Sequence, residues 1–165
     1  MQRAILAPCL FYQDGLFSMF RIWLPGRAVW ISVDAYGLCS TAVFRKFGAP
    51  YLLRTMAHFG GGWVHLHSSA LHLLPELVKL DGLLGIGVQD DPNSPRGFVH
   101  LAQIRRMVGD LPLQIDCTRD DLASGMAGRS LPGGVMYMVR QGIGTVAEAN
   151  DLAVRACDYR TPALA

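Results

Sequence analysis

Five short segments of the chain alternate apolar residues with polar or small ones, which is the pattern of β-strands. They cover residues 28–34, 60–67, 83–89, 111–116 and 135–141. Each is followed by a segment whose apolar spacing predicts a helix, and these cover residues 40–59, 73–80, 95–108, 120–126 and 146–159. Strands and helices that alternate in this way predict an α/β fold with a parallel sheet and right-handed crossovers.

The polar side of these predicted strands is more informative than the aliphatic side. On four strands it ends in a hydrophilic residue, and Gln141 is the equivalent on the fifth; the four are Asp34, His67, Gln89 and Asp116. Strands of an open doubly wound sheet are covered by helices on both faces and are apolar throughout. One aliphatic and one polar face instead favours a TIM-type (β/α) barrel, with its site at the strand ends.

About five strand–helix units are fewer than the eight of a complete barrel, so the sequence predicts a partial barrel. We assign the barrel to residues 28–160, a tail to 161–165, and no predicted structure to 1–27, where no period emerges. Five strands alone leave two sheet edges open. A missing N-terminal half or a homo-oligomer would close them.

Composition narrows the classes of partner and compartment. Hydrophobic residues make up 51% of the chain, charged residues 17%, and the net charge is +2. This charge is too small to favour nucleic acid or an anionic membrane as partner, so we expect a small-molecule substrate. The apolar stretch from Ala4 to Tyr12 is too short to span a bilayer. Four widely spaced cysteines without a CxxC motif predict reduced thiols and a cytoplasmic location.

His65 and His67 carry the strongest chemical signal. Two residues apart on a strand, they share one face, which is a recurrent half of a metal site. Asp116 is the third candidate ligand, and zinc is the only cofactor that these residues indicate. The alternative is a pair of inner histidines joined by hydrogen bonds. As catalytic residues we select Asp34, His67 and Asp116, although a carboxylate such as Asp34 also commonly caps a helix.

The remaining candidates concern substrate binding. Gly85 and Gly87 remove side chains from the polar face, which makes room either for a substrate or for a bulky neighbour. Polar side chains at the strand ends would contact that substrate, and they are Gln89, Arg140 and Gln141. The segment 90–93, Asp-Asp-Pro-Asn, is interpreted as a loop rather than as a pair of ligands.

The order and spacing of several motifs resemble the C-terminal part of the uroporphyrinogen decarboxylase superfamily. The likeness covers residues 20–160, and its motifs begin at Trp23-Leu-Pro-Gly, Ile31-Ser-Val-Asp, Phe47-Gly-Ala-Pro-Tyr, Gly61-Gly-Trp-Val-His-Leu-His-Ser, His72-Leu-Leu-Pro-Glu-Leu, Gly85-Ile-Gly-Val-Gln-Asp-Asp-Pro and Gly144-Thr-Val-Ala-Glu-Ala-Asn. The resemblance implies a β/α barrel. It also implies a tetrapyrrole or corrinoid-linked substrate, because the superfamily contains the haem-pathway decarboxylase and zinc-dependent corrinoid methyltransferases.

Two departures from the family pattern separate these activities. The decarboxylase's late Gly-His-Gly matches Gly142-Ile143-Gly144, which argues against decarboxylation of uroporphyrinogen itself. The methyltransferases' zinc-binding His-x-Cys matches His65-Leu66-His67, which keeps a ligand pair but replaces the thiolate. Three functions stay open: a carboxy-lyase with Arg140 as carboxylate clamp, a metal-dependent methyltransferase, and a catalytically silent half-barrel subunit.

Overall fold

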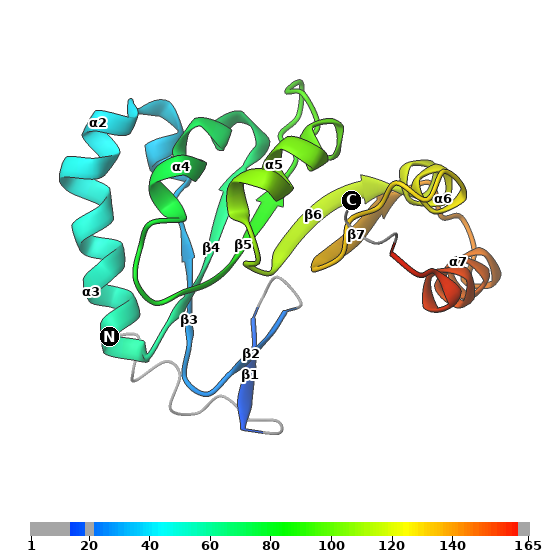
Figure 1. Cartoon of the computed structure of the whole chain (residues 1–165), viewed down its shortest axis with the longest axis horizontal. Coiled ribbons are helices and arrows are strands. Elements are labelled where there is room, and N and C mark those ends of the chain that lie inside the picture. The colour runs from blue at the N-terminus through cyan, green and yellow to red at the C-terminus, as the bar shows by residue number, and fades with distance from the viewer. Residues whose placement is uncertain (1–13, 19–21, 162–165) are drawn as a thin grey trace.

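The computed structural model of the chain describes residues 14–18 and 22–161. Its main sheet has five parallel strands in the order β3-β4-β5-β6-β7, which is also their order along the chain (Figure 1). The strands are β3 (Val29–Ser32), β4 (Gly62–His67), β5 (Leu83–Gln89), β6 (Leu113–Thr118) and β7 (Val135–Gln141). The predicted alternation of parallel strands with helices is confirmed.

Helices connect each strand to the next. Short 3-10 turns η1 (Asp34–Leu38), η3 (Ser68–Leu73) and η4 (Gly97–His100) follow β3, β4 and β5. The α-helices are α2 (Thr41–Val43), α3 (Ala49–Phe59), α4 (Leu74–Leu77), α5 (Leu101–Val108), α6 (Arg119–Ala127) and α7 (Val146–Asp158), with a π-helical turn η2 (Phe44–Gly48) between α2 and α3. Side-chain caps fix several starts, and Thr118 and Thr145 each form a capping box with an acidic residue three positions on.

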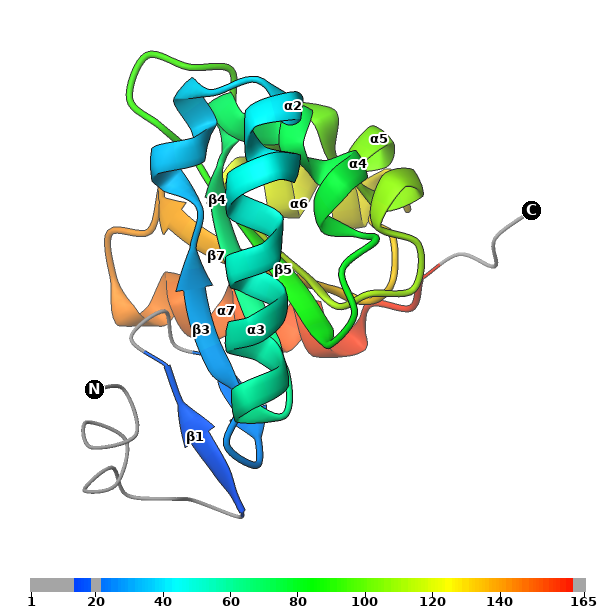
Figure 2. The same ribbon diagram turned by 90° about the vertical axis from the view of Figure 1, so that its left-hand side faces the viewer.

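The aliphatic face of the sheet packs under the helices and forms the main core. Strand residues such as Leu66, Ile86 and Ile115 are fully buried against helical residues such as Met56 and Leu74. Turned by 90°, the molecule shows α3 running along the outer side of β3 (Figure 2). This packing positions the site, because it turns the second, polar face of every strand away from the helices.

A small antiparallel hairpin lies against that second face. It consists of β1 (Gly15–Phe17) and β2 (Trp23–Pro25), with Gly15 opposite Pro25. Ile22 and Leu24 are buried there with Trp63 of β4 in a cluster separate from the main core. No structure was predicted for residues 1–27; residues 1–13 and 19–21 lie outside the described part of the chain, and the hairpin occupies much of the remainder.

Sequential strand order with helices on one face is compatible with part of an α/β barrel, although no closed barrel is seen. Within the described sheet, β3 and β7 are the edges. The first strand is shorter than predicted, since the chain turns into η1 at Asp34, and the fourth extends to Thr118 instead of ending at Asp116. No helix in the described part of the chain combines the length and apolar character needed to cross a bilayer.

Candidate functional site

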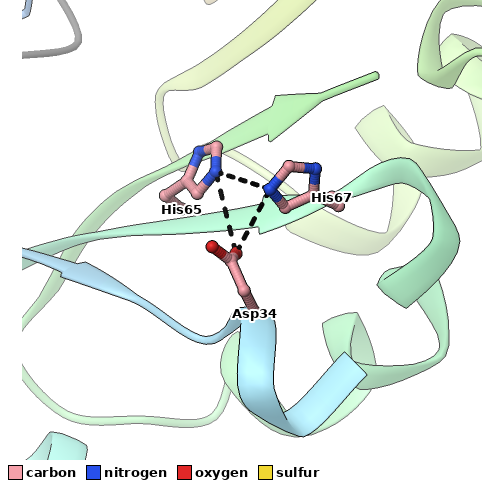
Figure 3. A group of neighbouring side chains, drawn as sticks. All are labelled: Asp34, His65 and His67. Carbon is pink, nitrogen blue, oxygen red and sulfur yellow. Dashed lines mark hydrogen bonds and ion pairs between the residues drawn. The ribbon is translucent and has the colours of Figure 1, made fainter. Parts of the chain in front are cut away.

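Asp34, His65 and His67 converge at one end of the sheet (Figure 3). The histidines project from the same face of β4, and Asp34 begins η1 directly after β3. The parallel register places Ser32 opposite His65, so the next turn of chain carries the carboxylate over the imidazoles. The backbone N–H of Asp34 donates to Ser32 Oγ at 3.2 Å, which fixes the start of that turn.

The three side chains present one ligand atom each toward a common centre. His65 Nε2 lies 3.3 Å from His67 Nε2, and Asp34 Oδ1 lies 3.7 Å from the first and 3.5 Å from the second. Tetrahedral zinc, with bonds of 2.0–2.2 Å to nitrogen and oxygen, separates its ligand atoms by about 3.3–3.6 Å. The donor set and its spacing therefore fit a zinc ion with one position left for water or substrate.

A second carboxylate, that of Asp91, contacts the ring nitrogen of His67 that faces away from the three-residue group. Asp91 Oδ1 lies 2.6 Å from His67 Nδ1, a short ion-pair contact that is not aligned as a hydrogen bond. Asp91 is itself fixed, because Ser69 Oγ donates to its Oδ2 and its backbone N–H donates to Ser68 Oγ at 3.4 Å. A carboxylate on the far nitrogen of a histidine orients the ring and makes the near nitrogen a better metal ligand.

Burial favours the uncharged form of His65, whose side chain is only 6% exposed. This burial lowers the pKa of His65, and the negative charge of Asp34 opposes the shift. The ring of Trp30 lies beside the imidazole, with the two centroids 5.1 Å apart. A neutral imidazole offers a lone pair to a metal at pH values where an exposed histidine would be partly protonated.

Asp116, predicted as both ligand and catalytic residue, lies on the same face of the sheet but binds other partners. Arg140 Nε donates to its Oδ1 at 2.9 Å, and the backbone N–H of Asp90 donates to its Oδ2 at 3.5 Å. Asp116 and Arg140 are near enough for their charges to act on the pKa of His65. Among the described residues, however, the group with metal-ligand spacing contains Asp34 and not Asp116.

A cavity of about 250 Å³ opens beside Asp116 at the ends of β5, β6 and β7. It brings together all three polar residues predicted to contact a substrate. Its lining consists of Gln89, Asp90, Arg96, Asp116, Cys117, Thr118, Arg140 and Gln141. Arg140 donates to Asp116 through Nε and itself lines this cavity.

The two glycines of β5 take different roles. A Cβ on Gly85 would lie 2.3 Å from the Trp63 ring, so the bulky neighbour fills this position. A Cβ on Gly87 would lie 3.0 Å from Gln114 Oε1 and 3.1 Å from Trp63 Nε1, with no other side chain so near. Gly87 is therefore also closely packed, although its neighbours are polar atoms at a less severe distance than the Trp63 ring over Gly85.

Asp90 and Asp91 are the site residues that sequence reasoning undervalued, because their segment was interpreted as a loop. The structure shows a loop, in which the Asp91 carboxylate contacts His67 and Asp90 lines the cavity beside Asp116. Asp90 Oδ1 accepts from the backbone N–H of Gly97 at 2.7 Å, and burial raises the pKa of Asp90. Their position could have indicated this, because Asp90 and Asp91 directly follow β5 and β5 pairs with β4, the strand that carries the histidines.

Comparisons of the chain with protein-family models, with curated proteins and with solved structures found no match. The resemblance to the uroporphyrinogen decarboxylase superfamily therefore stays a prediction. What the structure adds is the grouping of Asp34, His65 and His67, which depends on no relative.

Proposed function

We propose that this chain is part of a β/α barrel of the uroporphyrinogen decarboxylase superfamily and carries a zinc-dependent methyl-transfer site. The observation that supports the metal is the 3.3–3.7 Å spacing of the Asp34, His65 and His67 ligand atoms. The same strand position binds zinc in the methyltransferases that the sequence resembles. The substrate under this proposal is a small corrinoid-linked or tetrapyrrole molecule.

Each residue of the site has a separate role in this proposal. Asp34, His65 and His67 would hold the ion, and Asp91 would hold His67 in position. Bound zinc lowers the pKa of a coordinated thiol, so that it is present as the nucleophilic thiolate at neutral pH. Such a thiolate could accept a methyl group from a corrinoid, with the electrons of the broken methyl–cobalt bond staying on the corrinoid. The thiol proton would go to solvent, to which the site is open at Asp34, whose side chain is 48% exposed.

The remaining polar strand ends would bind the substrate. The cavity beside Asp116 offers side-chain amides from Gln89 and Gln141 and the outer guanidinium nitrogens of Arg140. Asp116 holds Arg140 through Nε and so directs its other nitrogens. In this proposal Asp116 is a positioning residue.

Equilibrium dialysis of the purified chain against zinc, followed by metal analysis, tests the proposal. We expect close to one zinc per chain, and His67→Ala should lose most of it. His100→Ala is the matched control, because this partly buried histidine lies in η4, outside the three-residue group. Absence of bound zinc in the parent protein, or equal retention by the parent and His67→Ala, would refute the metal site.

A transfer assay with methylcobalamin and a thiol separates methyl transfer from metal binding alone. We expect zinc-dependent loss of the methyl–cobalt absorbance, abolished in His67→Ala and kept in His100→Ala. Zinc binding without transfer would retain the site and reject this chemistry.

A second candidate function is a non-catalytic half-barrel subunit, and the open edges of the described sheet at β3 and β7 favour it. Size exclusion with light scattering tests whether the chain associates with a second copy. A stable, folded monomer would argue against the need for a second copy. The expected cytoplasmic location stays a prediction.

A further inference from the structure

Helix α7 buries very little of its surface for its length. Of its 13 residues, Leu152 is the only one that is buried in the described structure. Helices in folded proteins owe most of their stability to an apolar face packed against a neighbour. On α7, Val146 is 77% exposed and Val154 is 62% exposed. The helix therefore presents apolar surface that a partner can cover.

The exposed surface of α7 includes the flank turned away from α6. Glu148 faces α6, because its carboxylate lies 3.8 Å from the guanidinium of Arg119. Positions two residues before and after Glu148 lie about half a helical turn away, on the opposite flank. Exposed residues follow that flank at helical spacing, and we name them the α7 row: Val146, Asn150, Ala153 and Cys157.

The continuous helical segment α2–η2–α3 carries a bulkier exposed row. Val43, Phe47 and Tyr51 follow one another at four-residue spacing, and the two rings are 52% and 62% exposed. Arg45 donates two hydrogen bonds to Glu76 of α4. Because Arg45 is two residues from both Val43 and Phe47, these side chains lie on the flank turned away from α4. We name Val43, Phe47 and Tyr51 the α3 row.

The two rows belong to the two ends of the same array of strands and helices. Figure 1 shows α3 at one end of the molecule and α7 near the other. In Figure 2, which views the first of these ends, β3 and α3 lie in front. β3 and β7 are also the edges of the described sheet. In a β/α array each helix packs beside the next, so each row marks a helix contact that is unfilled within the described chain.

The sizes of the side chains in the two rows are complementary. The α3 row contains two aromatic rings, whereas Ala153 and Cys157 make the second half of the α7 row small. Large side chains opposite small ones allow two helices to interdigitate. Two α3 rows placed face to face would instead bring rings against rings.

The charges beside the rows are also complementary. Residues 41–59 contain three Lys or Arg residues and no Asp or Glu, whereas α7 contains three acidic residues and one arginine. Lys46 and Asp151 each lie six residues after the N-cap of their helix, Ser40 or Thr145. They therefore stand level when two such helices lie parallel. Charge pairing of this kind selects α3 against α7 and opposes α3 against α3.

We propose that the α3 row of one copy of this chain packs against the α7 row of a second copy, with β3 beside β7 of that second copy. Parallel strands end at the same side of a sheet, so this contact brings Gln141 of one copy toward Asp34 of the other. A head-to-tail contact either closes into a ring or repeats along a filament. The contact does not rest on the proposed metal site.

Two variants, each altered on one row, test the contact by size exclusion with light scattering. Tyr51→Glu adds a negative charge to the α3 row, and Ala153→Arg adds a bulky positive charge to the α7 row. We expect the parent chain to associate and each variant alone to associate at least about tenfold more weakly. An equimolar mixture should form a 1:1 heterodimer, identified by native mass spectrometry, because each variant keeps one intact row.

Val99→Glu and Ala102→Arg are the matched controls, since both positions are exposed on η4 and α5, away from the two rows. They should associate as the parent does. Circular dichroism checks that each variant is folded, and Lys46→Glu with Asp151→Lys replaces any variant that is not.

A parent chain that stays monomeric at every concentration would overturn the proposal. So would unchanged association of either row variant, or a mixture that forms no heterodimer. Zinc retention by a monomeric parent would reject the contact alone, and association of a chain that retains no zinc would reject the metal site alone.

Discussion

His67 Nδ1 lies 2.6 Å from Asp91 Oδ1, and this contact ties the histidine strand to the loop after β5. Removing the charge should loosen the ring and reduce its basicity as a ligand. We expect Asp91→Asn to weaken zinc binding by about 10–100-fold. Asp120→Asn, at an 83% exposed side chain, should leave the affinity unchanged. Competition titration with a chromogenic chelator measures both, and equal affinities would show that Asp91 does not support the site.

The identity of the carboxylate ligand is tested by a pair of substitutions. Asp34→Asn should weaken zinc binding by more than about 100-fold, since it removes a ligand rather than a supporting group. Asp116→Asn should change the affinity by less than about threefold, because Asp116 is bound to Arg140. The same titration measures both variants. The opposite order would return Asp116 to the ligand set that the sequence predicted.

Gly85 and Gly87 should respond differently to a methyl group. Gly85→Ala places Cβ 2.3 Å from the Trp63 ring, and overpacking of this kind typically costs about 1–3 kcal/mol of unfolding free energy. Gly87→Ala meets Gln114 Oε1 and Trp63 Nε1 at 3.0–3.1 Å, which is a milder overlap, and should cost less unfolding free energy than Gly85→Ala. Urea unfolding compares the two variants with the parent. An unchanged free energy of unfolding in Gly85→Ala would mean that Trp63 does not lie over Gly85.

Cys117 should be unreactive in the folded protein. Burial, with the charges of Asp121 and Asp116, raises the pKa of its thiol to about 12, so little thiolate exists at pH 8. Cys157 is exposed on α7. We expect iodoacetamide at pH 8 to label Cys157 at least tenfold faster, as followed by peptide mass spectrometry, and to label both equally in urea. Rapid labelling of native Cys117 would contradict the packing around β6.

The strands could be predicted because alternation fixes both the element and its faces. The bounds of β7 agree with the prediction, and the aliphatic faces of β4 and β5 form the core as expected. The hairpin β1–β2 escaped prediction since its strands have three residues each, too few for a period to show.

The composition of the site was predictable only in part. His65 and His67 share a face because they are two residues apart on one strand. Which carboxylate joins them as the third metal ligand, Asp34 or Asp116, depends on the partner that each carboxylate contacts. Asp116 meets Arg140, 24 residues later in the chain, and Asp34 reaches the imidazoles because β3 ends early. Alternation fixes the face on which each side chain lies. It does not say which side chain of another strand or loop that side chain meets.

X-ray absorption at the zinc edge of the loaded protein tests the central claim most directly. The account predicts a first shell of nitrogen and oxygen only, at about 2.0–2.2 Å, with two imidazoles in the parent chain and one around the small amount of zinc that His67→Ala retains. A sulfur shell at about 2.3 Å, or an unchanged imidazole count in His67→Ala, would contradict a site built from Asp34, His65 and His67.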